Sequence, residues 1–363
     1  MTILAYIILI FTAIQFLVAL GNLISETTLP ESENKPANLV SVLIPARNEE
    51  NNIGNILNDL KNQRYQNIEI IVFNDQSEDK TAEIVNEFAR DDNRIRLIHS
   101  DGLPDGWFGK NYACHSLSKH ARGEYLLFLD ADVRIKNNII GNAVSFSIRH
   151  NLSLISIFPK QIIKTFGERI TVPDMNYILV SLLPLIFVRK LRFPSMSAAN
   201  GQFMFFKADI YHLLEPHRLM KKNKVEDIHI AREFKKRRLK IACLLGDETI
   251  RCRMYNGFRE SVNGFSKNVI AFFGNSYLLA VLFWLITTFG IVAILIALPV
   301  KYWIIYLSMY FLTRIFISVA SQQNIFYNLI YFLLLQFSLG LFIYKAFMNQ
   351  YFRKLEWKGR IIE

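Results

Sequence analysis

The chain has 363 residues, of which 52% are hydrophobic and 29 are phenylalanines, so its composition argues against an ordinary soluble protein. Its 42 Lys and Arg outnumber its 31 Asp and Glu, and the net charge of +11 suits an anionic membrane surface, a phosphorylated substrate or a nucleic acid. The charge forms no patch interleaved with aromatic residues, which argues against nucleic acid, and three cysteines without a C-x-x-C spacing argue against zinc and a disulfide framework.

The N-terminal segment over residues 3–24 is apolar, uncharged and long enough to cross a bilayer core. No basic segment precedes it and no typical cleavage site follows, so we expect an uncleaved transmembrane anchor over residues 1–25 rather than a signal peptide. Residues 26–38 are polar and contain two prolines, which predicts a linker.

From residue 39 onward, runs rich in Val, Ile and Leu alternate with segments of helical apolar spacing. The first kind is typical of strands buried on both faces, and the second of amphipathic helices. We predict strands over 39–46, 68–75, 95–100 and 124–133, and helices over 47–63, 76–90 and 109–121. This alternation indicates an α/β fold with a mostly parallel, doubly wound sheet, which binds its ligand beyond the carboxyl ends of the strands.

Polar residues stand at those strand ends: Arg47 and Glu49 after the first, Asp75 after the second, Asp130 and Asp132 after the fourth. No G-x-G-x-x-G follows the first strand and no G-x-x-x-x-G-K-[ST] occurs, so phosphate must be held in another way. Two carboxylates on one loop, completed by diphosphate oxygens, would make a Mg²⁺ or Mn²⁺ site. A D-x-D triplet taken alone is a weak signal, because a solvated turn explains most such triplets.

The rest of the chain carries further apolar segments. Residues 175–193 contain Pro184 and end in basic residues, which predicts a helix lying in the membrane interface, with a buried core helix as the alternative. Three segments follow at about 277–300, 302–320 and 325–347, and Arg314 makes the middle one the weakest span. The positive-inside rule places residues 39–270 in the cytoplasm, although three later crossings would put the basic tail at 348–363 outside.

Six motifs occur in the order found in family-2 glycosyltransferases: IPARNEE (44–50), VFNDQSEDKT (72–81), GWFGKNYAC (106–114), GEYLLFLDADV (123–133), AANGQFMFFK (198–207) and VEDIHIARE (225–233). Over residues 39–270 the chain therefore resembles this family, which implies a Rossmann-like GT-A fold. With its flanking spans it is similar to the membrane-bound branch acting on lipids, which includes ceramide, hopanoid-associated and carotenoid (diaponeurosporenoate-type) glycosyltransferases.

The resemblance also implies residue roles. The nucleotide sugar would contact Pro45, Arg47, Glu49, Asp75, Lys110 and Asp130, and the metal would bind Asp132 and Asp130. Gly201, Gln202 and Glu226 would lie near the sugar or acceptor, and Asp227 would be the general base. The Q-x-x-R-W motif of many membrane-bound relatives is missing from the second predicted interfacial segment, 251–270. Candidates there for binding diphosphate or a lipid headgroup are Arg253, Tyr255, Arg259 and Lys267.

We therefore expect a metal-dependent, inverting glycosyltransferase of the cell membrane that transfers one hexose from a nucleotide sugar, UDP-glucose first among them, to a lipid. The missing motif and the few spans argue against a processive polysaccharide synthase. The nearest alternative is a polyprenyl-phosphate sugar transferase, whose phosphate acceptor needs no base. A membrane scaffold with a degenerate transferase domain is the alternative without catalysis. The sequence does not indicate an oligomeric state.

Overall fold

The computed structural model describes residues 1–34, 36–351, 356–357 and 360–361, and the chain divides into two compact units. The sheet unit consists of Glu26–Lys160 and Leu185–Cys252. The helical unit consists of Met1–Ser25, Gln161–Pro184 and the described part of Arg253–Glu363. Residues 161–184 and 253–270, which we expected inside the transferase domain, thus group with the membrane helices. Most of the predicted basic tail over 348–363 lies outside the described residues.

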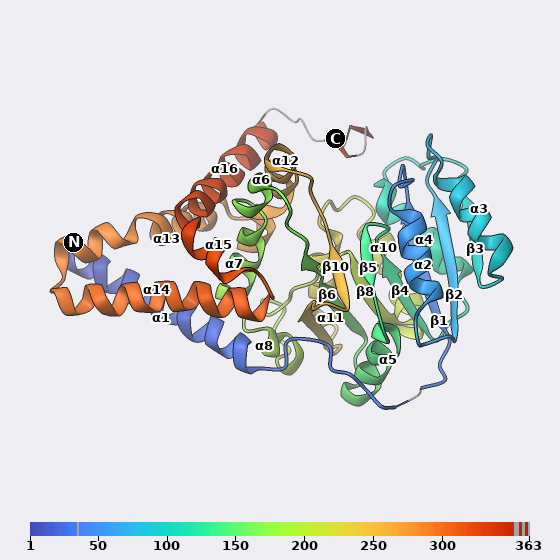
Figure 1. The fold of residues 1–363 in the computed structure, drawn as a ribbon, viewed down its shortest axis with the longest axis horizontal. Helices are drawn as coiled ribbons and strands as arrows, with labels where there is room; N and C mark the ends of the chain where they lie inside the picture. The colour runs from blue at the N-terminus through green and yellow to red at the C-terminus, as the bar shows by residue number, and fades with distance from the viewer. Residues whose placement is uncertain (35, 352–355, 358–359, 362–363) are drawn as a thin grey trace. The chain divides into compact units, whose positions relative to one another are not determined.

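The sheet unit is built on seven strands in the order β3-β2-β1-β4-β8-β6-β9 (Figure 1). Their bounds are β1 Val40–Ala46, β2 Ile68–Asn74, β3 Ile95–His99, β4 Tyr125–Leu129, β6 Leu154–Phe158, β8 Phe203–Lys207 and β9 Ile241–Leu245. Strands β3, β2, β1 and β4 run parallel, as do β6 and β9, whereas β8 is antiparallel to both of its neighbours. The expected α/β class and mostly parallel sheet are confirmed.

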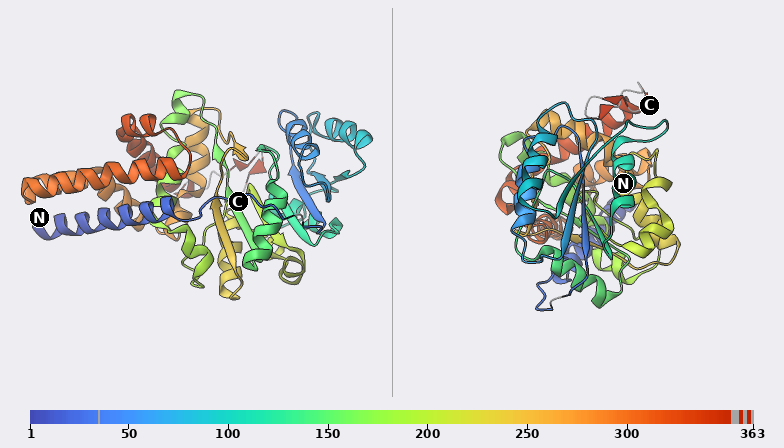
Figure 2. Two further views of the ribbon diagram at one scale, coloured as in Figure 1. Left: turned by 60° about the horizontal axis from the view of Figure 1, so that its bottom comes forward. Right: turned by 90° about the vertical axis from the view of Figure 1, so that its right-hand side faces the viewer.

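Helices cover both faces of this sheet (Figure 2). They are α2 Ile53–Lys61, α3 Thr81–Asp91, α4 Gly109–His120, α5 Ile139–His150, α8 Leu185–Lys190, α9 Ala208–Leu214, α10 Pro216–Leu219 and α11 Glu226–Lys236. Alternate β1 residues such as Val42 and Ile44 pack with α2, α3 and α5 in one hydrophobic core. On the opposite face Phe206 contacts Tyr211 of α9 and Phe234 of α11. The sheet is therefore buried on both sides, as its continuous apolar strands predicted.

Two short strands flank the predicted D-x-D motif. The strand expected over 124–133 ends at Leu129, and a separate strand, β5 Val133–Ile135, pairs antiparallel with β10 Ile250–Cys252. The amide of Val133 donates to the carbonyl of Asp130, so the chain turns at the two aspartates. β7 Lys160–Gln161 marks the boundary between the units.

Among its described residues, the helical unit contains four helices that are long and apolar enough to cross a membrane: α1 Thr2–Ile24, α13 Tyr277–Ala297, α14 Val300–Ala320 and α16 Phe332–Tyr351. α1 and α14 lie side by side (Figure 1). The unit also contains α6 Phe166–Arg169, α7 Pro173–Leu182, α12 Phe258–Asn268, the 3₁₀ helix η1 Val269–Phe273, α15 Ile325–Ile330, β11 Glu356–Trp357 and β12 Arg360–Ile361.

Two of the expected apolar segments differ in their bounds from the helices of the structure. The single interfacial helix over 175–193 is instead α7 and α8, because the chain leaves the helix before Pro184. α7 is buried from Pro173 through Ser181 and packs against α1 and α14, so the alternative of a buried helix describes it better. The last apolar segment, expected over 325–347, consists of the short helix α15 and the candidate span α16, which begins only at Phe332.

Candidate active site

The loops after β1 and β2 are joined to each other by hydrogen bonds. Asp75 is 2% exposed, and its backbone amide donates to the carbonyl of Ala46 over 2.8 Å. Arg47 donates from Nη1 to the carbonyl of Asp75 over 2.7 Å, and the amide of Glu49 donates to the hydroxyl of Thr81 over 2.8 Å. These bonds fix three of the predicted nucleotide-contacting residues at the carboxyl ends of neighbouring parallel strands. Pro45 lies within β1 itself.

The D-x-D turn is fixed by the antiparallel strand beside it. Because β8 runs against β4, its first residue, Phe203, pairs with the last residue of β4, Leu129. The amide of Asp130 consequently donates to the carbonyl of Gln202 over 3.1 Å. The Gln202 side-chain amide lies 3.5 Å from both carboxylate oxygens of Asp132. The antiparallel direction of β8 thus carries residues 201–202 to the edge where β1, β2 and β4 end.

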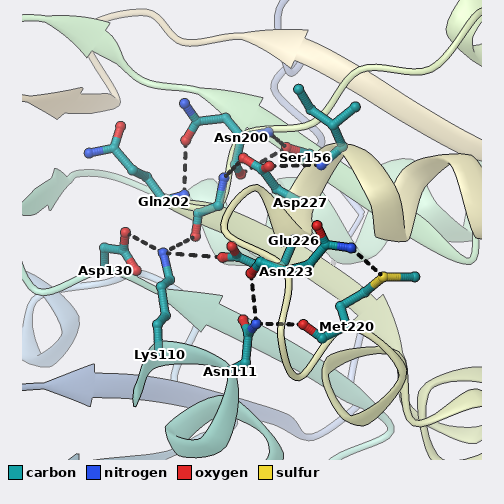
Figure 3. Close-up of polar contacts among 12 residues, drawn as sticks. Lys110, Asn111, Asp130, Ser156, Asn200, Gln202, Met220, Asn223, Glu226 and Asp227 are labelled. Atoms are coloured by element: carbon teal, nitrogen blue, oxygen red, sulfur yellow. Dashed lines mark hydrogen bonds and ion pairs between the residues drawn. The ribbon is translucent and has the colours of Figure 1, made fainter. Parts of the chain in front are cut away.

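Lys110, in the first turn of α4, connects the D-x-D turn to the start of α11 (Figure 3). Its Nζ donates to Asp130 Oδ2 over 2.7 Å and to the carbonyl of Gly201 over 3.3 Å. It also lies 3.9 Å from Glu226 Oε1. Burial lowers the pKa of Lys110, but the carboxylates of Asp130 and Glu226 outweigh this effect and raise it. Lys110 therefore stays charged among the acidic side chains.

Asp227 follows Glu226 in the first turn of α11, and both its oxygens accept backbone hydrogen bonds. Oδ2 accepts from the amide of Gly201 over 2.9 Å, and Oδ1 from its neighbour Ile228 over 2.7 Å. Burial raises the pKa of Asp227 more than these bonds and the charge of Lys110 lower it. Burial also raises the pKa of Glu226, to about 7. A carboxylate that is held rigidly and has a raised pKa is a stronger proton acceptor than an ordinary exposed aspartate.

Gly201 lies where these groups converge, and there is little room for a side chain at this position. A Cβ at this position would lie 3.1 Å from Lys110 Nζ, 3.3 Å from Glu226 Oε1 and 3.7 Å from Asp227 Oδ2. Any larger residue would push into the hydrogen-bonded cluster. Gly201 therefore allows the two acidic residues of α11 to approach Lys110.

Several residues that support this cluster were missed in the sequence. Asn111 donates from Nδ2 to the carbonyls of Met220 and Asn223, tying the chain before α11 to α4. The hydroxyl of Ser156 and the backbone of Asn200 exchange hydrogen bonds of 2.7 and 3.0 Å (Figure 3). The position of Asn111 inside the GKNYAC motif was a usable signal. Ser156, a lone serine in an apolar strand, gave no such signal in the sequence.

The described residues contain no group of three or more His, Cys, Asp and Glu side chains that could hold a metal ion. The D-x-D turn offers two carboxylates, and burial together with the negative charges of Asp130 and Glu49 raises the pKa of Asp132 to about 6. A cation would relieve this repulsion, and carboxylate oxygens suit Mg²⁺ and Mn²⁺. Asp130 and Asp132 therefore fit a divalent ion whose remaining ligands come from a substrate.

The four predicted diphosphate or headgroup ligands after β10 belong to the helical unit. The charge of Arg253 is already paired, since its Nη2 donates to the buried carboxylate of Glu168 over 2.8 Å. Tyr255 packs edge-on against Phe265, with 4.9 Å between ring centroids. Arg259 and Lys267 are exposed on α12. Their roles, like those of the residues in the sheet unit, stay predictions.

A doubly wound sheet with an antiparallel β8 and acidic loops at one edge is the arrangement of the GT-A fold. Comparison with solved structures agrees. A mannosyltransferase from Pyrobaculum calidifontis, solved in complex with GDP-Man and Mn²⁺, has a TM-score of 0.55 with this chain. The match covers 96% of this chain and 99% of the mannosyltransferase chain, with 16% sequence identity. This likeness concerns the fold alone. The sequence model described as glycosyl transferase family 2 matches residues 41–214, so this part of the chain carries a domain of that family.

Two curated relatives carry the same name, 4,4'-diaponeurosporenoate glycosyltransferase. The protein of Staphylococcus haemolyticus is 27% identical over 247 residues, which is 65% of this chain and 62% of the relative. That of Staphylococcus aureus (strain USA300) is 24% identical over 345 residues, covering 88% of this chain and 87% of the relative. The first match thus spans less than two thirds of that relative's length, whereas the second spans 87% of its relative.

Proposed function

We propose that this chain is a membrane-bound, inverting glycosyltransferase that transfers a single hexose from a nucleotide sugar to a lipid acceptor. The observation that carries the proposal is the single cluster in which Lys110 joins Asp130 to Glu226 while Asp227 is held by Gly201. Residues suited to bind a diphosphate therefore lie beside a residue suited to be a base. UDP-glucose is the donor we would test first.

The cluster's residues have separable roles in such a reaction. Glu49 and Asp75 would accept hydrogen bonds from the nucleoside, while Lys110 would offset the negative charge of the diphosphate. A Mn²⁺ or Mg²⁺ ion held by Asp132 and Asp130 would stabilise the departing diphosphate. Gly201 and Gln202 lie between these groups and the base, the place for the sugar.

Asp227 would act on the acceptor. Its carboxylate takes the proton of an acceptor hydroxyl as that oxygen bonds to the anomeric carbon. The bond from that carbon to the diphosphate breaks on the opposite face, so the configuration inverts. Glu226, with its pKa raised to about 7, would contact the sugar or acceptor.

The names of the relatives favour a second acceptor chemistry, since a diaponeurosporenoate is a carboxylate. A carboxylate acceptor, like a polyprenyl phosphate, is already ionised at pH 7 and needs no base. The two chemistries therefore differ in what they require of Asp227. Replacing Asp227 by Asn should abolish transfer to a hydroxyl lipid and largely spare transfer to a carboxylate.

The experiment uses the full chain in liposomes with several UDP-sugars and a lipid extract, with and without Mn²⁺. Mass spectrometry of the lipids identifies both sugar and acceptor. Transfer that depends on a divalent ion and disappears in Asp132→Asn supports the proposal. No glycosylated lipid with any donor under any metal condition would refute it.

We also propose that the sheet unit is cytoplasmic, because basic segments such as 189–192 and 235–238 lie within it. Four candidate spans support a multi-pass membrane protein. Single cysteines introduced on exposed faces of the sheet unit should react with a membrane-impermeant maleimide only after cells are opened. Labelling of intact cells would place the unit outside.

A further inference from the structure

A short stretch of the sheet unit exposes aromatic and basic side chains together. Phe187 of α8 is 40% exposed, and Phe193, three residues beyond the end of that helix, is 63% exposed. Lys190 and Arg192, which stand between them in the sequence, are exposed as well. We call these four residues the aromatic–basic surface. Exposed aromatic residues beside cations are typical of segments that rest on a membrane interface.

The support beneath this surface is fixed by buried contacts. Leu185 and Val188 form the buried face of α8, which packs against β9. Lys235 of α11 is 2% exposed, and its Nζ donates to the carbonyl of Leu191 over 2.6 Å, just beyond the end of α8. The helix is thus held by apolar packing on its inner face and by a buried cation at its C-terminal end. Its outer face is left to solvent or to a partner.

The covalent path out of α1 limits the distance between α8 and the membrane boundary. α1 has 23 residues and is therefore about 34 Å long, whereas a hydrocarbon core is about 30 Å thick. An α1 that crosses the membrane consequently ends at the boundary of the bilayer. Glu26 follows Ile24, the last residue of α1, by two positions, which is at most about 7 Å of chain.

Glu26 is bound to α8 within the sheet unit. Its Oε2 accepts a hydrogen bond from Arg189 Nη1 over 2.8 Å, and the two side chains form an ion pair. On the other side of α8, within the helical unit, Asn22 in the last turn of α1 donates to the carbonyl of Leu183 over 2.9 Å. α8 begins only two residues after Leu183. Both connections keep α8 close to the level at which α1 leaves the bilayer.

The charge of this stretch favours an anionic bilayer over a neutral one. Arg189 is neutralised by Glu26, but Lys190 and Arg192 add two exposed positive charges. Each basic residue close to an anionic lipid surface strengthens binding by about fivefold, so the two together contribute about 30-fold.

We propose that the aromatic–basic surface binds an anionic lipid bilayer, with Phe187 and Phe193 inserted below the lipid phosphates and Lys190 and Arg192 at their level. The proposal rests on the membrane insertion of α1, which is part of the proposed function, and does not depend on the sugar or on the transfer reaction. Such binding would hold the sheet unit against the membrane at a second point besides the chain that leaves α1.

The test places a fluorophore beside this surface in the full chain. The three native cysteines are buried, so an exposed Ser195→Cys, two residues after Phe193, takes the environment-sensitive label. The protein is reconstituted in liposomes of phosphatidylcholine or of an equimolar mixture of phosphatidylcholine and phosphatidylglycerol. Each liposome is prepared with and without a lipid that carries a nitroxide near the top of its acyl chain, which quenches only fluorophores at the bilayer.

The label should be quenched more strongly in the mixed liposomes than in phosphatidylcholine. Lys190→Gln/Arg192→Gln should lower the quenching in mixed liposomes to about the phosphatidylcholine level, and Phe193→Ser should lower it in both. Lys61→Gln/Arg90→Gln is the matched control, because it removes two exposed cations from α2 and α3 and should keep the full quenching.

A second labelling site controls for position. Glu87→Cys carries the same label on an exposed position of α3, which packs on β3, whereas α8 packs on β9. These strands are the two edges of the seven-stranded sheet, about 29 Å apart. The label on α3 should therefore stay unquenched in both liposomes.

Three results would overturn the proposal. The first is quenching at Ser195→Cys no greater than at Glu87→Cys. The second is equal quenching in both liposomes that Lys190→Gln/Arg192→Gln leaves unchanged. The third is blue-shifted emission that lipid nitroxides do not quench and that grows with the protein-to-lipid ratio, since a second copy of the chain would then cover the surface. Flotation with the liposomes reports insertion of α1 separately and no sugar donor is present, so a failure here is distinguishable from a failure of the proposed function.

Discussion

Replacing Lys110 by Met removes the cation around which the candidate active site is arranged. Methionine has a similar length and fills the same space without a charge. The change deletes a 2.7 Å ion pair with Asp130 and a 3.9 Å interaction with Glu226. Both carboxylates remain, with Asp227 beside them, and their mutual repulsion is no longer compensated.

The cost follows from burial. Breaking a buried ion pair by removing one partner costs about 3–5 kcal/mol. The side chains of Lys110 and Asp130 are 24% and 23% exposed, so water screens the remaining charges and about 3 kcal/mol is the better figure. In the wild type the charge of Lys110 lowers the pKa of Glu226. Part of the cost of losing Lys110 will therefore appear as protonation of Glu226. A nucleotide diphosphate would also lose a contact, and we expect its Kd to rise by about 10–100-fold.

The assay compares the wild type with Lys110→Met and with Lys119→Met, which removes an exposed lysine from the same helix. Tm is followed at pH 7 in detergent, and UDP binding by calorimetry with Mn²⁺ present. Lys110→Met should lower Tm by several degrees and weaken UDP binding, while Lys119→Met should change neither. Wild-type UDP affinity in Lys110→Met would refute a diphosphate contact, and an unchanged Tm would refute the electrostatic role.

Three further predictions concern the same cluster. Burial raises the pKa of Asp227, and a base must be ionised to act. The rate of transfer to a hydroxyl lipid should therefore fall as the pH is lowered, with a midpoint above the ordinary aspartate pKa near 4. A midpoint at pH 4 or below would contradict this. Asp132→Asn should raise the Mn²⁺ concentration needed for half-maximal activity by at least about tenfold, and an unchanged metal titration would exclude Asp132 as a ligand. Gly201→Ala should lower the free energy of unfolding by about 1–3 kcal/mol and kcat/KM by at least tenfold. The reason is that the alanine Cβ would lie 3.1 Å from Lys110 Nζ and 3.3 Å from Glu226 Oε1. Kinetics equal to the wild type would show that the cluster adjusts freely.

Local patterns in the sequence predicted the elements of the sheet unit well. The apolar run before Arg47 is β1, and the helical spacing of Ile53, Ile56, Leu57 and Leu60 marks the buried face of α2. These patterns are readable because burial imposes a period of two or 3.6 within a few residues. The same patterns did not predict the bounds of two apolar segments, which each form two helices, α7 with α8 and α15 with α16.

The acidic residues at the ends of β1, β2 and β4 could also be placed from the sequence, since parallel strands end at one edge of a sheet. The residues that contact them from other segments could not be placed in this way. Nothing in AANGQFMFFK specifies that β8 runs antiparallel between β4 and β6, yet this direction brings Gly201 and Gln202 to the D-x-D turn. In the same way, the burial of Arg314 against Tyr177 joins residues 137 positions apart.

The sequence by itself determined the class of fold, the existence of four long apolar segments and the carboxylates of the candidate site, because each depends on local hydrophobic pattern or on residue type. Only the tertiary structure decided that Lys110 bridges Asp130 and Glu226, and that Gly201 holds Asp227. These contacts join segments from α4, β4, β8 and α11. Strand order and direction are set by how the whole sheet buries its two faces, and no local segment records that choice.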